Sequence, residues 1–143
     1  MAAFLAEQTK VQVGTIGPQG EPHLTTLFHV VLDGQIAFWT YGRSQKIVNL
    51  RRDPRISCLL EAGEEYAELR GVSIRGTARL LEEYDDVRAV GSLVVRRMAG
   101  NADLGQFGED LVAQQARKRV AVVVEPTKVA SWDHARMAGP PGS

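Results

Sequence analysis

The fold is decided by residues 23–41, which read HLTTLFHVVLDGQIAFWTY. Apolar and β-branched residues dominate both halves of this stretch, as is typical of strands. Between them, Asp33-Gly34 is the kind of two-residue turn that closes a tight hairpin. We therefore expect a strand over His23–Leu32 and a returning strand over Gln35–Tyr41, and a chain that is mainly β.

The segments on either side of this hairpin also read as short strands and helices. Alternating apolar residues indicate strands, and apolar residues at helical spacing indicate helices. Six strands in all, mostly meandering and interrupted by short helices, favour a six-stranded split β-barrel. Besides the hairpin, we expect strands around Val11–Val13, at Arg55–Glu61, at Ala67–Leu81 with a bulge at Gly71, and at Val120–Val124, and helices at Ala2–Gln8, Ser44–Arg52, Glu82–Met98 and Gly105–Ala116.

The strand Val120–Val124 is apolar at every position. A strand with this pattern is buried on both faces. Burial inside the domain and burial at a subunit interface both remain open.

The length and composition of the chain limit the number of domains and the kinds of partner that we expect. A chain of 143 residues with 44% hydrophobic residues is long enough for one domain, which we place at residues 1–136, followed by a flexible tail at 137–143. Seventeen basic residues balance seventeen acidic ones, which argues against nucleic acid or an anionic membrane as the main partner. No signal peptide or membrane span is recognisable, and the lone Cys58 reads as a core residue. These features predict a cytoplasmic protein.

Several chemistries are not supported by the sequence. The histidines His23, His29 and His134 with one cysteine make no zinc pattern, and His23 and His29 would lie about 20 Å apart on one strand. We therefore expect no metal site. No nucleophile elbow, phosphate-binding P-loop or dinucleotide fingerprint is present. If the protein is an enzyme, a bound cofactor is expected to carry the difficult chemistry.

One segment is chemically distinctive, from Thr40 to Arg52. A strand ends there, Gly42 loosens a loop, and a helix begins near Ser44, so free backbone N–H groups and the positive end of the helix dipole would face an anion. Lys46 lies in the first turn, where a cation opposes the dipole unless an anion is shared. A phosphate cradle and a merely solvated basic helix face fit this spacing about equally; contact of Arg51, Arg52 and Arg55 with nucleic acid is a weaker alternative.

These segments also carry a resemblance to a known family. The motifs are Gly20–His23, Phe38–Thr40 followed by Ser44–Lys46, Asn49–Arg55, and Ile74–Ala78. In their order and spacing the chain resembles the pyridoxamine 5′-phosphate oxidase-like split-barrel superfamily from Phe4 to Asp133. The resemblance implies a fold like that of FMN-binding proteins and a homodimer that binds a flavin, or the deazaflavin coenzyme F420, in clefts between the subunits.

The resemblance also implies roles for individual residues. The chain at Thr25, Thr26, Leu27 and Phe28 would run along the flavin-type ring, and Trp39 and Thr40 would contact the ring and its ribityl chain. Phosphate would be held by Ser44, Gln45 and Lys46, with Arg43 and Asn49 nearby. Trp132, near the end of the last strand, would reach the partner subunit's site, although a plain hydrophobic anchor is an equal alternative.

Two departures from the family narrow the expected activity. The chain lacks the C-terminal arginine-containing segment of the true oxidases, so oxidation of vitamin B6 is not expected. Its overall pattern looks most like the actinobacterial branch that uses F420, whose extra negative charge would suit Arg43, Lys46 and Arg51. We therefore expect an F420-dependent oxidoreductase acting on a conjugated small molecule; FMN as the cofactor and a non-catalytic cofactor-binding protein are the alternatives. No catalytic residue is assigned, and solvent or Tyr41 would deliver any proton.

Overall fold

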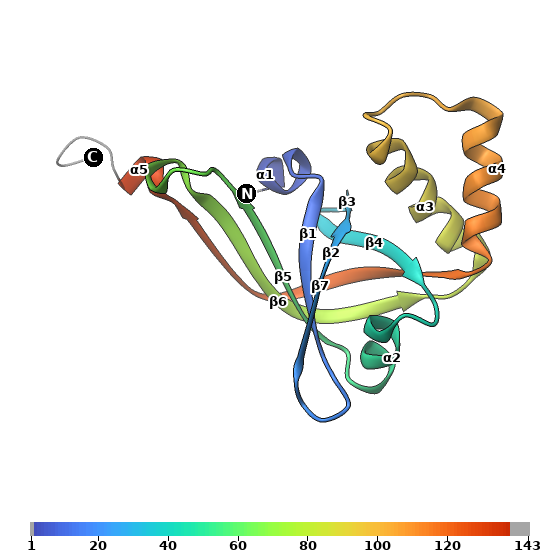
Figure 1. The fold of residues 1–143 in the computed structure, drawn as a ribbon, viewed down its shortest axis with the longest axis horizontal. Coiled ribbons are helices and arrows are strands. Elements are labelled where there is room, and N and C mark those ends of the chain that lie inside the picture. The colour runs from blue at the N-terminus through green and yellow to red at the C-terminus, as the bar shows by residue number, and fades with distance from the viewer. Residues whose placement is uncertain (1, 138–143) are drawn as a thin grey trace.

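The computed structural model describes residues 2–137, and its centre is one antiparallel sheet of seven strands that curls into a half-barrel (Figure 1). The order of strands across the sheet is β2-β1-β5-β6-β7-β4-β3. The mainly β architecture predicted from the sequence is confirmed, with seven strands in place of six. The strands are β1 Lys10–Ile16, β2 Pro22–Phe28, β3 Val30–Leu32, β4 Gln35–Tyr41, β5 Arg55–Ala62, β6 Arg70–Leu81 and β7 Arg119–Asp133.

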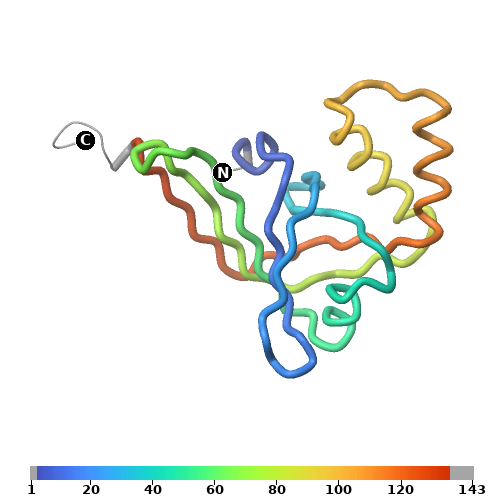
Figure 2. Tube along the Cα trace, in the orientation of Figure 1, coloured from blue at the N-terminus to red at the C-terminus, as the bar shows by residue number. Residues whose placement is uncertain are grey.

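Short helices surround the sheet. The two longest, α3 and α4, lie together at one end, and α3 packs on β4 and β7. In Figure 2, the paired strands β6 and β7 run from this end to the opposite one, where α5 follows β7. The helices are α1 Ala2–Glu7, α2 Gln45–Arg52, α3 Tyr84–Met98, α4 Gly105–Ala116 and α5 His134–Met137, with one 3-10 turn at Tyr66–Glu68. No helix within residues 2–137 is long and apolar enough to cross a membrane.

The hairpin expected at residues 23–41 is confirmed only around its turn. Asp33 and Gly34 have positive φ angles of 50° and 78°, and β3 pairs with β4. The single strand predicted over His23–Leu32 is wrong, because it breaks at His29 and β2 pairs with β1 instead. The ring of His29 is buried with its Nε2 2.9 Å from the Leu5 carbonyl oxygen, and its backbone N–H donates to the Thr9 carbonyl. These bonds remove His29 from the ladder and produce the seventh strand.

The bulge predicted at Gly71 is also wrong. The register between β6 and β7 shifts between Arg75 and Gly76, and β6 begins at Arg70 because residues 66–68 form the 3-10 turn. Gly71 serves a different need: a Cβ atom there would lie within 2.7 Å of the Trp132 ring. The glycine therefore marks close packing and not a bulge.

The core lies on both faces of β4 and β7. Val120, Val122 and Val124 point into one apolar cluster, inside the half-barrel, and Ala121 and Val123 point into a second cluster beneath α3 and α4. The apolar strand predicted to be buried on both faces is therefore buried within a single chain. Of the two explanations left open by the sequence, burial inside the domain is the one that accounts for this strand.

The helices agree closely with their predicted bounds. α4 has the predicted limits, α3 begins two residues later than expected, and α2 follows Ser44 as its N-cap. Of the predicted tail, residues 138–143 lie outside the described residues, and Met137 ends α5.

Candidate functional site

The start of α2 is positioned by the end of β4. The Gly42 N–H donates to the Lys118 carbonyl at 2.9 Å and the Ser44 N–H to the Tyr41 carbonyl at 3.0 Å, which fixes the loop between strand and helix. Ser44 has extended backbone angles and is the N-cap, but its side chain makes no capping bond. Its Oγ atom is buried and has no hydrogen-bond partner among the described residues. The Ser44 hydroxyl and the first N–H groups of α2, which have no intrahelical acceptor, therefore both lie at the N-terminus of this helix.

Lys46, in the first turn of α2, is buried although it is a lysine. Its side chain is 9% exposed, and its Nζ atom donates to Oγ1 of Thr40 at 3.3 Å, a long bond to a neutral acceptor. Burial lowers the pKa of Lys46, and the nearby positive charge of Arg119 lowers it further. Buried amines are normally paired with an anion. Among the described residues no carboxylate forms an ion pair with this one.

Asn49 and Gln45 form a brace between α2 and β1. Asn49 is fully buried; its Nδ2 donates to Oγ1 of Thr15 at 3.0 Å, and its Oδ1 accepts from Nε2 of Gln45 at 2.7 Å. Arg52 also donates to the Asn49 oxygen, at 3.4 Å. These amides hold the helix in place, so the structure gives them a positioning role beside the phosphate role that the resemblance implies.

The two remaining arginines of the predicted cradle differ in their surroundings. Arg51 pairs with Glu82 and donates to the Gly42 carbonyl at 3.3 Å, so it stabilises the loop. Arg43 is exposed and takes part in no ion pair among residues 2–137. Arg43 is thus the free surface cation closest in sequence to Ser44.

A groove of about 390 Å³ lies between β2 and the α3–α4 pair. Three of the residues that the resemblance places beside a ring, Thr26, Leu27 and Phe28, line it, as does Trp39. Thr25 is not among the lining residues, and its hydroxyl is buried without a partner in the described chain. The remaining lining residues are Tyr41, Val94, Val95, Met98, Leu111, Gln115 and Arg119.

Arg119 was missed by sequence reasoning. Its guanidinium carbon lies 4.8 Å from the ring centroid of Trp39 and 4.2 Å from that of Tyr41, and its Nε donates to Oε1 of Gln115 at 3.3 Å. Arg119 reaches the groove because β7 pairs with β4, with Arg119 opposite Tyr41. Only this long-range register identifies the residue, and no local motif surrounds it.

Trp132 lies away from this site within the chain. It is at the far end of β7, beside Gly71, where it lines a separate hollow of about 390 Å³ with Phe4 and Arg70. Figure 1 shows β7 leading from the α3–α4 end to α5, so a single chain does not bring Trp132 to the start of α2.

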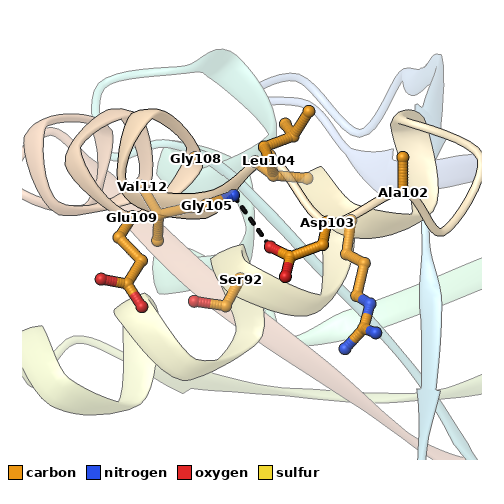
Figure 3. Close-up of a pocket in the computed structure, with 10 residues that line it drawn as sticks. Ser92, Ala102, Asp103, Leu104, Gly105, Gly108, Glu109 and Val112 are labelled. Carbon is orange, nitrogen blue, oxygen red and sulfur yellow. Dashed lines mark hydrogen bonds between the residues drawn. The ribbon is translucent and has the colours of Figure 1, made fainter.

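A third hollow, of about 250 Å³, lies between α3 and α4 (Figure 3). Asp103 accepts a hydrogen bond from the Gly105 N–H at 2.8 Å, and thereby occupies the N-terminus of α4. Glu109 and Arg96 also line it, so two carboxylates outnumber one cation and the hollow offers an anion less than the start of α2 does. No group of three metal-ligating side chains gathers anywhere in residues 2–137.

Comparisons with known proteins agree with this geometry. The family model described as pyridoxamine 5′-phosphate oxidase matches residues 1–133, while no curated protein matches the chain. A conserved hypothetical protein from Mycobacterium tuberculosis is 42% identical, with a TM-score of 0.89 over 99% of this chain and 88% of its own. An F420 reductase is 17% identical (TM-score 0.71; 90% of this chain, 94% of its own), and the heme storage protein HutZ from Vibrio cholerae is 16% identical (TM-score 0.67; 92% and 89%). These last two likenesses show the fold alone.

Proposed function

Because the chain belongs to the pyridoxamine 5′-phosphate oxidase family, we propose that it is an F420-dependent oxidoreductase acting on a conjugated small molecule. The fold is that of proteins that include an F420 reductase, which is covered over 94% of its length. Family and fold alone do not fix function. The proposal therefore depends on the start of α2.

The observation that carries the proposal is that the start of α2 holds one buried hydroxyl without a partner and one buried amine without an anion. The Ser44 hydroxyl is buried without a partner in the described chain, and the Lys46 amine is buried with only the Thr40 hydroxyl as acceptor. A phosphate group would accept from both, and from the first N–H groups of α2. The residues present therefore fit a phosphate-bearing cofactor.

The groove fits the flat part of the same cofactor. When it is bound, F420 supplies hydride chemistry to the substrate. The chain's own part is to bind and to orient: Thr26, Leu27 and Trp39 line the groove, and Val94 and Met98 on α3 present apolar surface that excludes water.

A homodimer is part of the proposal. On β7, every residue from Glu125 to Ser131 is exposed in the single chain, and Val129 is among the exposed large apolar side chains. A second copy packed on this face would cover it and would carry Trp132 toward the partner's groove. Light scattering of the purified protein should give the mass of a dimer; a monomeric mass at micromolar concentration would remove this part of the proposal.

The test of the cofactor is a fluorescence titration of the purified protein with F420 and, separately, with FMN. We expect tight binding of F420 and weaker binding of FMN, because exposed Arg43 can meet the additional negative charge of F420. A preference for FMN would indicate a flavin oxidoreductase of the same fold. Binding of F420 with no turnover of any conjugated substrate would indicate a cofactor carrier.

Two variants test the phosphate assignment. Lys46→Ala should weaken F420 binding by about 10- to 100-fold, since a charge-assisted hydrogen bond is worth about 1.5–3 kcal/mol. Lys118→Ala removes an equal charge from an exposed side chain beside the same loop and should have little effect. Equal affinities for Lys46→Ala and the unmodified protein would exclude the cradle.

A further inference from the structure

The groove has an unusual charge composition. Its eleven lining residues include one charged side chain, Arg119, and no carboxylate. Most of the rest are apolar or aromatic, so a ligand that fills the groove meets a flat apolar surface with one positive charge. Charge complementarity then favours a ligand that is itself flat and carries one acidic group.

Arg119 is held in position without an acidic partner. The Trp39 and Tyr41 rings lie under its guanidinium group, and the Gln115 amide oxygen accepts from its Nε. Its two terminal nitrogens make no hydrogen bond to any described residue. A guanidinium group fixed in this way presents a fork that matches the two oxygens of a carboxylate.

Lys46 adds a second positive charge nearby. Arg119 and Lys46 repel each other strongly enough to contribute to the lowered pKa of the lysine. Two neighbouring cations with no carboxylate among the groove residues raise the local positive potential. Arg119 at the groove and Lys46 at the start of α2 therefore each offer a positive charge to an anion.

We infer that Arg119 is the specificity-determining residue of the groove and binds the carboxylate of a planar, conjugated organic acid. The conjugated part of that acid would contact the apolar side chains of the groove that the ring of the cofactor leaves uncovered. This inference rests on the proposed function in so far as the acid is its substrate. The inference adds that the substrate is negatively charged. The proposed function does not specify the charge of the substrate.

The experiment compares two probes of nearly the same shape, a carboxylate and its neutral amide. Dissociation constants of cinnamate and of cinnamamide are measured by ligand-observed NMR on the full chain, with and without saturating F420. Arg119→Gln should weaken cinnamate by about 10- to 100-fold, because it removes a charge-assisted bidentate contact, and should leave cinnamamide unchanged. Arg119→Lys, which keeps the charge and loses the fork, should fall between the two. Arg117→Gln, at an exposed neighbouring position, should match the unmodified protein.

Each outcome decides the inference. Equal changes for both probes would show that Arg119 only maintains the shape of the groove, and would overturn it, as would failure of the unmodified protein to bind cinnamate in either state. Loss of F420 affinity in Arg119→Gln with cinnamate affinity intact would also overturn it, because Arg119 would then bind the cofactor. Selective loss of cinnamate in a protein that does not bind F420 would refute the proposed function and support this inference.

Discussion

Gly91 of α3 is expected to be necessary for the position of Trp39, and Gly91→Ala tests this directly. A Cβ atom at Gly91 would lie within 2.7 Å of three atoms of the Trp39 ring. The ring is 6% exposed, and it would have to move by about 1 Å to restore a contact distance of about 3.5 Å. Overpacking of this kind costs about 1–3 kcal/mol, and alanine returns about 1 kcal/mol of helix propensity. The two terms leave a net loss of about 0–2 kcal/mol in the free energy of unfolding. Since the ring is rigid, we expect the upper half of this range, about 1–2 kcal/mol.

Urea unfolding followed by circular dichroism measures this loss. Tryptophan emission in a Trp132→Phe background, where Trp39 is the one remaining tryptophan, should also shift, because the ring moves relative to Arg119. Ala89→Gly, at an exposed position of the same helix, calibrates the glycine–alanine difference and should destabilise by about 1 kcal/mol with unchanged emission. A Gly91→Ala variant that gains about 1 kcal/mol with unchanged emission would refute the reasoning.

Three further predictions concern buried polar groups. Asn49→Ala should lower the free energy of unfolding by about 1–3 kcal/mol in urea titrations, because it leaves the buried hydroxyl of Thr15 without its partner; an unchanged midpoint would contradict this. Burial raises the pKa of Cys58 to about 12, so the folded protein should resist a thiol reagent even at pH 9 and react on unfolding, and rapid reaction of the native protein would show that the thiol is accessible. Burial lowers the pKa of Lys46 in the folded protein below its ordinary 10.5. Between the lowered pKa of the folded state and the ordinary pKa of the unfolded state, the unfolded chain binds more protons. Unfolding experiments should therefore find that stability rises with pH in that window, and Lys46→Met should lack the rise.

Local signals in the sequence were sufficient for much of the fold. Asp33-Gly34 specified its own turn through positive φ angles that glycine and aspartate tolerate, and the apolar spacing of Tyr84, Val87, Val90 and Val94 predicted α3 to within two residues of its observed start. His29 was not predictable in the same way. Its exclusion from the strand depends on hydrogen bonds to Leu5 and Thr9. The pattern of side chains within residues 23–32 does not predict these long-range bonds.

The residues of the candidate site also differ in whether local sequence could predict them. Ser44 and Lys46 were predicted because a strand end, a glycine and a helix start are adjacent in the sequence, and the structure buries the Ser44 hydroxyl and the Lys46 side chain. Arg119 was not found, because it enters the groove through the pairing of β7 with β4. The roles of the predicted site residues in binding stay predictions until the titrations are made.

The order in which the paired strands are made has a consequence for protein synthesis. Its residues 120–124 complete both apolar clusters, and they pair with β4 and β6, which are made much earlier. A nascent chain that ends before residue 119 would therefore expose one open face of each cluster and the unpaired edges of two strands, surfaces that promote aggregation. Folding of this protein should therefore wait until β7 has been made, and premature termination near the end of α4 should give an insoluble product.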